Sequence, residues 1–272
     1  MRDRVEARLD ALVRAHRVTI AVVVPVVGAV LLLASAAGRL PAVLAFNPLL
    51  VLAGVLAMRL PLVAGLAPAV DRRAGLAVAA LATYAYAVEA VGVQTGLPYG
   101  EFHYGVDLGP MVGGVPLALP VLFVPLVANA WLLALLLRPD AGALGRLPLA
   151  AALVLLVDAV LDPAAVALGF WSYAASGAYY GVPATNFAGW VLAAAVGVLA
   201  LDAGFDRAAV RARLADCPYL LDDLVSFTLL WGAVNVAFGQ WVPVALTAAL
   251  VLALVRLGRF DLLATGRARP AA

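Results

Sequence analysis

The chain has 272 residues, of which 65% are hydrophobic and 12% charged, and its mean hydropathy is +1.04. This composition is typical of a membrane protein, and a net charge of +2 does not favour a nucleic-acid partner. A single cysteine, Cys217, excludes an internal disulfide and a cysteine-based metal cluster.

The pattern of apolar runs predicts an all-α, polytopic membrane helical bundle that forms one domain over residues 1–272. Residues 1–17 are polar and carry both acids and arginines, so we expect a cytoplasmic segment. We then expect eight transmembrane helices at 18–37, 40–58, 74–95, 112–137, 147–169, 186–204, 221–238 and 241–256. The fourth contains Pro116, Pro120 and Pro125, which predicts that it bends or begins late. Residues 257–272 are expected to form a cytoplasmic tail.

The basic residues are all arginines, and their distribution predicts the orientation. If the N-terminus is cytoplasmic, Arg39 alone falls outside, and the other arginines, including Arg59 and Arg146, fall inside. The positive-inside rule therefore predicts that both termini are cytoplasmic.

Two loops with a similar sequence then lie on the outer side, between spans three and four and between spans five and six. Each contains tyrosine and glycine, followed by a Gly-Val-Pro segment that enters a helix; this segment ends at Pro116 in the first loop and at Pro183 in the second. Proline fits the first helical turn, where its missing N–H is not needed. The similarity suggests a duplicated hairpin.

Three acids lie inside predicted spans, where a charge is expensive and normally serves a function. Counting ~1.5 Å per residue from the inner helix ends places Glu89 and Asp162 at the same depth, in the outer half. Asp158 lies one turn deeper, on the same face as Asp162. Carboxyls that share a low-dielectric site do not all ionise, so one can act as an acid while another acts as a base.

Structural alternatives exist for each of these residues. Asp162 precedes Pro163 and could cap a helix after a break, while Glu89 could reach the membrane interface. His103, in the first outer loop, could simply be solvated. Asn129 and Asn186 could form hydrogen bonds between helices, and Asp222 and Asp223 are expected to cap a helix N-terminus. Several aromatic residues could form a belt at the membrane interface: Trp171, Tyr173, Tyr179, Tyr180 and Trp190.

The segments "VEAVGVQTGLPYGEFHYGVDLGPMVGGVPLALP" and "DAVLDPAAVALGFWSYAASGAYYGVPATNFAGW" resemble the membrane carotenoid-biosynthesis proteins typified by bisanhydrobacterioruberin hydratase. The resemblance covers about Ala74 to Trp190. It implies that water is added across the terminal isopentenyl C=C bonds of an acyclic long-chain carotenoid, giving tertiary alcohols of the bacterioruberin type. The expected partners are this carotenoid, membrane lipid and neighbouring membrane enzymes of carotenoid biosynthesis.

With that reaction in view, we expect a carboxylic acid to protonate the alkene and water to capture the tertiary carbocation, without a metal or other cofactor. Asp162 or Asp158 would be the acid, Glu89 would orient the water, and Asn186 would hold the water or the new hydroxyl. The remaining candidates would close the site from outside or flank the cation: His103, Tyr99, Glu101 and Tyr104 for closure, and Trp171 and Tyr180 for the cation.

Three other functions are compatible with parts of the sequence. Buried acids and broken helices are also typical of a proton-coupled transporter, which is the main alternative. A membrane prenyltransferase would need aspartate-rich motifs that the chain lacks near Asp158 and Asp162. A third alternative is a non-catalytic subunit that holds carotenoid for a neighbouring enzyme.

Overall fold

The computed structural model describes residues 1–261 and is built almost entirely of helices. The main helices are α1 (Arg2–Ala15), α2 (Val24–Ala36), α3 (Pro48–Leu66), α4 (Arg72–Thr95), α5 (Leu119–Leu137), α6 (Ala143–Leu168), α7 (Ala184–Gly204), α8 (Arg207–Asp216), α9 (Asp222–Ala237) and α10 (Trp241–Arg256). A π-helical turn, Thr19–Val23, leads into α2, and a 3-10 turn, Ala67–Ala69, follows α3. Four short strands lie in the loops: β1 (Phe102–Tyr104), β2 (Met111–Val112), β3 (Val115–Pro116) and β4 (Trp171–Tyr173).

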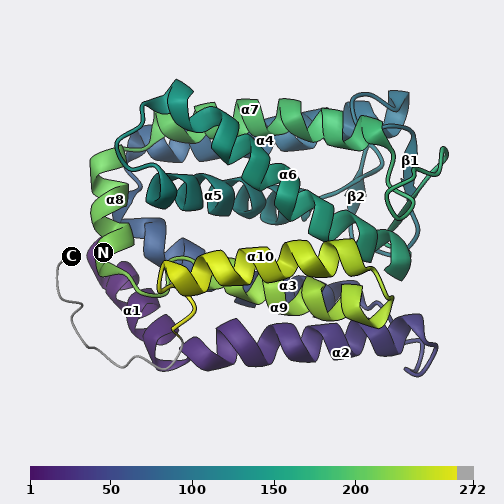
Figure 1. Cartoon of the computed structure of the whole chain (residues 1–272). Helices are drawn as coiled ribbons and strands as arrows, with labels where there is room; N and C mark the ends of the chain where they lie inside the picture. Colours follow the sequence, from purple (N-terminus) through teal and green to yellow (C-terminus); the bar gives the residue numbers. More distant parts are fainter. Residues whose placement is uncertain (262–272) are drawn as a thin grey trace.

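The long helices lie side by side, with the strands at one end of the bundle and α1 and α8 at the other (Figure 1). Six helical segments of the described chain are long and apolar enough to cross a membrane: Thr19–Ala36, Pro48–Ala69, Arg72–Thr95, Leu119–Leu137, Ala143–Leu168 and Ala184–Gly204. The predicted helical membrane bundle is confirmed. The last two predicted spans coincide with α9 and α10, which have 16 residues each, and the count of eight crossings stays a prediction.

The second predicted span, 40–58, lies about eight residues before the helix observed there, α3, which begins at Pro48 and ends at Leu66. Residues 42–46 form turns, and Asn47 caps α3, its side-chain oxygen accepting from the N–H groups of Leu49 at 3.0 Å and Leu50 at 3.2 Å. Proline at the next position suits the first helical turn. As a consequence Arg59 lies inside α3, and Arg146 likewise lies inside α6, whereas both were expected beyond the inner helix ends. Arg267 and Arg269 lie outside the described residues, as does the expected tail from residue 262.

The Gly-Val-Pro segments also differ from expectation. Pro116 pairs with Met111 in the β2–β3 hairpin, and α5 begins late, at Leu119, as its prolines predicted. Pro183 is the cap residue that precedes α7 and so lies just outside the helix. The two segments therefore share a sequence without sharing a conformation.

Prolines inside α5 and α6 free backbone carbonyls four residues earlier, because proline has no N–H to donate. The Val121 carbonyl, freed by Pro125, accepts from Arg59 Nε at 3.2 Å. The Ala159 carbonyl, freed by Pro163, accepts from the Tyr179 hydroxyl at 3.0 Å. Helix α5 therefore continues through Pro125, and α6 through Pro163, with the freed carbonyl satisfied.

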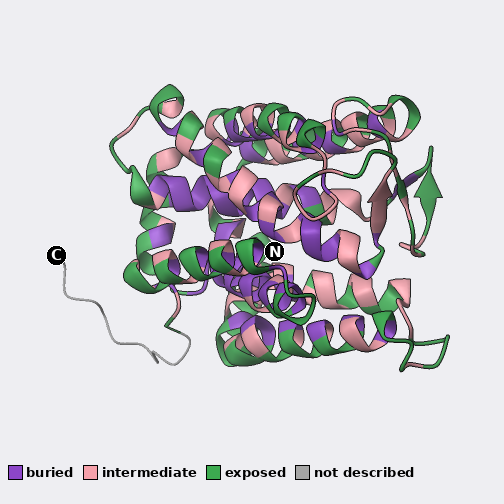
Figure 2. Cartoon of the chain, turned by 45° about the vertical axis from the view of Figure 1, so that its right-hand side comes forward, coloured by how far each residue is buried: buried purple, intermediate pink, exposed green. Residues whose placement is uncertain are grey.

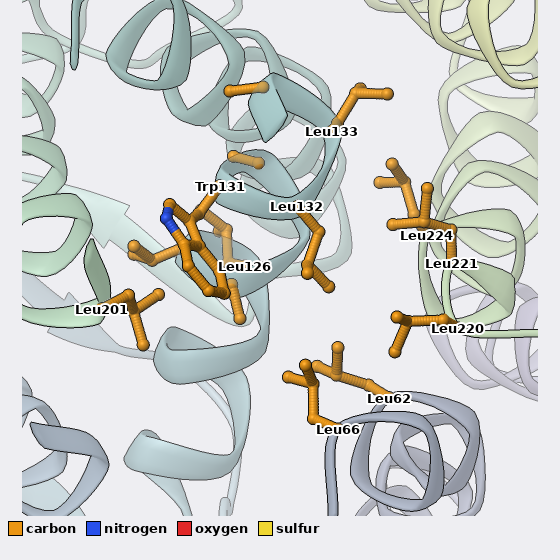
Figure 3. Packing of buried hydrophobic residues seen from close by; sticks show 14 of the residues in the cluster. Leu62, Leu66, Leu126, Trp131, Leu132, Leu133, Leu201, Leu220, Leu221 and Leu224 are labelled. Carbon is orange, nitrogen blue, oxygen red and sulfur yellow. The ribbon is translucent and has the colours of Figure 1, made fainter. Parts of the chain in front are cut away.

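The centre of the core is α5, which is apolar on all sides and is surrounded by other helices. Figure 3 shows its Trp131, Leu132 and Leu133 between Leu201 of α7 and the leucines around the start of α9. Trp131 donates its indole N–H to Asp202 at 2.7 Å, and Arg146 pairs with the same carboxylate at 2.8 Å. These buried charges are therefore paired.

Many large apolar side chains of the outer helices point away from the bundle. On α2 and the turn before it, Val23, Val26, Val27 and Val30 are all exposed. Figure 2 shows the same pattern, with exposed residues on the outward faces of the helices and buried residues inside. A surface of this kind is suited to contact with lipid.

Candidate functional site

The two outer loops are joined by a strand pair. Strands β1 and β4 are antiparallel, with Phe102 opposite Tyr173, His103 opposite Ser172 and Tyr104 opposite Trp171. Because side chains alternate along a strand, the four aromatic residues share one face of this ribbon and His103 and Ser172 share the other. The aromatic face lines a cavity inside the bundle.

This cavity has a volume of about 250 Å³ and is lined mostly by apolar and aromatic side chains from α2 to α7 and α9. Glu89, Asp162 and Asn186 line it close to the strands, while Arg59 and Asn129 line it farther along the helices. Carboxyl groups therefore face an apolar space that is covered by aromatic rings, which is an unusual setting for an acid.

Each carboxyl in the wall is held by a tyrosine of the loop that follows its own helix. Tyr104 donates its hydroxyl to Glu89 Oε1, and Tyr173 donates to Asp162 Oδ2 at 2.9 Å. Burial and the neighbouring carboxyl raise the pKa of both phenols, so each tyrosine stays protonated and acts as the donor. The arrangement occurs once in each half of the site, which gives a structural counterpart to the repeated loop sequence.

Asn186 connects the two aspartates of α6. Its side-chain nitrogen donates to Asp162 Oδ2 at 2.6 Å and to Asp158 Oδ2 at 3.1 Å. Asp158 is completely buried and is not among the residues that line the cavity, and its Oδ1 has no partner in the described part of the chain. Asp162 is thus in the wall, with Asp158 one turn behind it.

The contacts of Asp162 and Glu89 differ from those of a helix cap or of a side chain that only reaches the membrane interface. Helix α6 runs without a break through Pro163, and Asp162 accepts from side chains rather than capping a helix. Glu89 is partly exposed, and it lines the cavity and binds Tyr104.

Tyr99 and Trp171, two of the residues predicted to bind substrate, also line the cavity. The Tyr99 hydroxyl and the Trp171 indole nitrogen are buried without a hydrogen-bond partner among residues 1–261. Gly189 allows the Tyr99 ring to pack against α7, because a Cβ at that position would lie 2.5 Å from the ring. Both residues therefore contribute to the cavity wall while their polar atoms stay buried.

Three residues that the sequence predicted to belong to the site do not line the cavity. His103 is exposed and shares a hydrogen bond of 2.9 Å with Ser172 on the outward face of the ribbon, and Glu101 is exposed next to it. Tyr180 has a φ of 51°, and its hydroxyl accepts from the Val242 N–H at 3.2 Å, which fastens the loop to the start of α10. Strand alternation and this contact turn the three side chains away from the acids.

Several other residues of the cavity wall had a different predicted role, or none. Tyr173, expected in an aromatic belt, binds Asp162. The rings of Phe123 and Trp190 stack with centroids 5.2 Å apart in the cavity wall. The two-residue alternation of aromatics in Phe102–Tyr104 and Trp171–Tyr173 is the sequence signal that could have identified the strand residues.

Asp222 and Asp223 lie in the first turn of α9, but their carboxylates pair with arginines instead of capping the backbone. Asp222 pairs with Arg17, and Asp223 pairs with Arg59 and accepts from Asn129. The helix end still favours negative charge at these positions. Within residues 1–261, no group of three or more His, Cys, Asp or Glu residues is arranged to hold a metal ion.

Comparison with known proteins identifies the family to which the chain belongs. The family described as "Carotenoid biosynthesis protein" matches residues 46–254, which include both loops and all three acids. The chain belongs to this carotenoid biosynthesis family. A bisanhydrobacterioruberin hydratase from Haloarcula japonica is 59% identical to the chain over 258 residues, which cover 94% of this chain and 88% of that protein. No solved structure matches the chain. Its family and its apolar helices together indicate a multi-pass membrane protein.

Proposed function

We propose that this member of the carotenoid biosynthesis family is a carotenoid hydratase that adds water across a terminal isopentenyl C=C bond. The observation that carries the proposal is the pair of carboxyls, Asp162 and Glu89, facing one apolar, aromatic cavity. The named hydratase, which is 59% identical over most of its length, supports the same reaction class. It also argues against the transporter alternative, because that relative is named as an enzyme.

In the proposed reaction Asp162 donates its proton to the less substituted carbon of the alkene, and the new C–H bond leaves a tertiary carbocation. Water attacks this carbon and forms the C–O bond, and Glu89 accepts the proton that the water loses. The cycle closes when that proton returns to Asp162 through water, so the net change is the addition of one H₂O. Only carboxyl groups and water take part.

The surroundings of Asp162 support its role as the acid. No arginine or histidine of the described chain pairs with Asp158, Asp162 or Glu89. If all three were ionised, no cation would offset their negative charges in this apolar site, and this favours a protonated Asp162. The donors Asn186 and Tyr173 both bind Oδ2 of Asp162, which leaves Oδ1 to carry the proton. Aromatic faces of Phe102, Trp171 and Trp190 in the wall would stabilise the carbocation.

The cavity is too small for a whole long-chain carotenoid, so we propose that only the chain end enters. Leu31, Leu44 and Leu50 line the cavity and are 37%, 44% and 47% exposed, which places a mouth beside α2 and the start of α3. The rest of the substrate would lie outside this mouth in lipid. We also propose that the chain crosses the membrane eight times with both termini cytoplasmic. In this topology the acids lie in the outer half of the membrane.

A product assay tests the proposal. The chain is expressed in cells that accumulate an acyclic carotenoid with terminal isopentenyl ends, and the pigments are analysed by chromatography and mass spectrometry. We expect a gain of one or two waters, absent in Asp162→Asn and in Glu89→Gln. Unchanged pigment with folded wild-type protein in the membrane would refute hydration of that substrate, and full activity of both amide variants would refute the mechanism.

A further inference from the structure

Asp158 takes no direct part in the reaction proposed above, although it is the most completely buried of the three acids. It lies in α6 one turn from Asp162 and does not line the cavity, so it contacts neither the alkene nor the reacting water. A carboxyl group inside a membrane bundle is costly and usually has a function. Any effect of Asp158 on the reaction must therefore pass through a neighbouring side chain.

That neighbour is Asn186 of α7. A primary amide nitrogen carries two N–H groups, and Asn186 Nδ2 donates to Asp158 Oδ2 at 3.1 Å and to Asp162 Oδ2 at 2.6 Å. Two fixed acceptors hold the amide in one orientation, whereas a single acceptor would let the amide plane turn about the hydrogen bond. Asp158 is therefore the second anchor of this amide.

The amide oxygen of Asn186 points away from the two carboxyls, because the nitrogen binds both of them. No group of residues 1–261 donates to this Oδ1, and it is not one of the buried atoms that lack a partner, so it is open to the cavity that Asn186 lines. A water molecule there can donate one O–H to Asn186 Oδ1 and the other to Glu89. A lone pair of the water oxygen then remains free for the carbocation.

Asp158 fits this role as a neutral acid. No arginine or histidine of the described residues pairs with it, so an ionised Asp158 would be an uncompensated buried charge. Its Oδ2 accepts from Asn186, and its Oδ1 has no partner among residues 1–261, so Oδ2 is the carbonyl oxygen and the proton belongs on Oδ1. A neutral amide at position 158 would present the same acceptor to Asn186.

We propose that Asp158 is a positioning residue: as a neutral acceptor it holds the Asn186 amide so that the amide oxygen faces the reacting water. The inference rests on the proposed function and gives Asp158 a role distinct from that of Asp162. An acid that gives up its proton cannot be replaced by an amide, whereas an acid that only accepts a hydrogen bond can. One substitution therefore separates the two roles.

Steady-state rates of the purified full chain in nanodiscs, with the carotenoid of the product assay, test this role. We expect Asp158→Leu, which removes the acceptor, to lower kcat about tenfold with KM unchanged, because Asp158 does not line the cavity. Asp158→Asn keeps the acceptor and should restore most of the lost rate, in contrast to Asp162→Asn. If Asp158→Leu does not fold, Asp158→Ala takes its place.

Asn235→Leu is the matched control. Asn235 is a buried polar residue that binds α6 through the Val160 carbonyl and does not line the cavity, so its replacement should leave kcat unchanged. A double variant tests the coupling. Adding Asp158→Leu to Asn186→Leu should lower kcat no further, because Asp158 acts through this amide.

Infrared spectroscopy detects the same contact without any activity. A protonated carboxyl absorbs at a C=O frequency separate from that of a carboxylate, and a hydrogen bond to its carbonyl oxygen lowers this frequency. We expect the wild type to show such a band that is absent from Asp158→Asn. In Asn186→Leu the band assigned in this way should move to higher frequency.

A rate for Asp158→Asn as low as that for Asp158→Leu, losses that multiply in the double variant, or no protonated band for Asp158 would overturn the proposal. If the wild type adds no water to the carotenoid, the proposed function fails, and the infrared band still decides whether a neutral Asp158 holds Asn186. The two proposals therefore fail in distinguishable ways.

Discussion

At the scale of single residues, the site consists of two carboxyl–phenol pairs that face one apolar cavity. Glu89 with Tyr104 comes from one hairpin and Asp162 with Tyr173 from the other. A hydrogen bond to a carboxyl group in a dry site restricts its orientation and favours one proton position. The tyrosines are therefore expected to position the acids without contacting the reacting carbons.

Replacing either phenol tests this role. We expect Tyr173→Phe and Tyr104→Phe to lower kcat about tenfold to a hundredfold. A hydrogen bond to a charged group contributes ~1.5–3 kcal/mol, and each 1.4 kcal/mol is tenfold; Glu89 is charged as the base, and Asp162 becomes charged as it gives up its proton. Rates are measured per folded protein in membranes, with Tyr179→Phe as the control. Its hydroxyl binds the Ala159 carbonyl and not an acid, so that variant should keep its kcat. Equal losses in all three variants would contradict a positioning role.

At the scale of elements, α2 and α3 line the proposed mouth of the cavity and the β1–β4 ribbon lines the end near the acids. Gly54 of α3 lines the cavity, and a Cβ added there meets no atom within 4 Å. A large side chain at this position would occupy space intended for substrate without straining the core.

We expect Gly54→Phe to raise KM by about tenfold or more, since each 1.4 kcal/mol of lost binding is tenfold. Its thermal stability should remain close to that of the wild type. Val63→Phe, on the same helix but exposed and not in the cavity wall, is the control and should change neither quantity. Unchanged kinetics in Gly54→Phe would place the entry route elsewhere.

At the scale of the whole molecule, the proposed orientation assigns the two ends of the bundle to opposite sides of the membrane. The strand-bearing loops would lie outside, and α1, α8 and the α5–α6 connection would lie inside (Figure 1). This arrangement places most arginines on the cytoplasmic side, consistent with the positive-inside rule.

Labelling with a membrane-impermeant maleimide tests the orientation in intact cells. In a Cys217→Ala background, Ser176→Cys in the loop before α7 should be labelled, and Asp140→Cys between α5 and α6 should react only after lysis. Both positions are exposed, so accessibility within the protein does not limit the reaction. The reverse pattern would require the site to lie toward the cytoplasm.

Much of this architecture follows from the sequence, because the bilayer imposes strong rules on it. Long apolar runs determined the helices, and the predicted ends of α6, α7, α9 and α10 agree with the structure to within a few residues. The expense of intramembrane charge drew attention to Glu89, Asp158 and Asp162, and the two loop segments indicated the family. These are local or compositional signals, which a single chain carries without its fold.

Only the tertiary structure decided which side chains meet. Equal depth along two helices does not fix the direction in which a residue points, so the sequence could not show that Glu89 and Asp162 face one cavity while Asp158 lies behind. Pairing of β1 with β4, more than 60 residues apart, turned Tyr104 and Tyr173 inward and His103 outward. The same limit concealed the contacts of Arg59, whose place inside α3 depends on where Asn47 starts the helix, and whose partners come from α5 and α9.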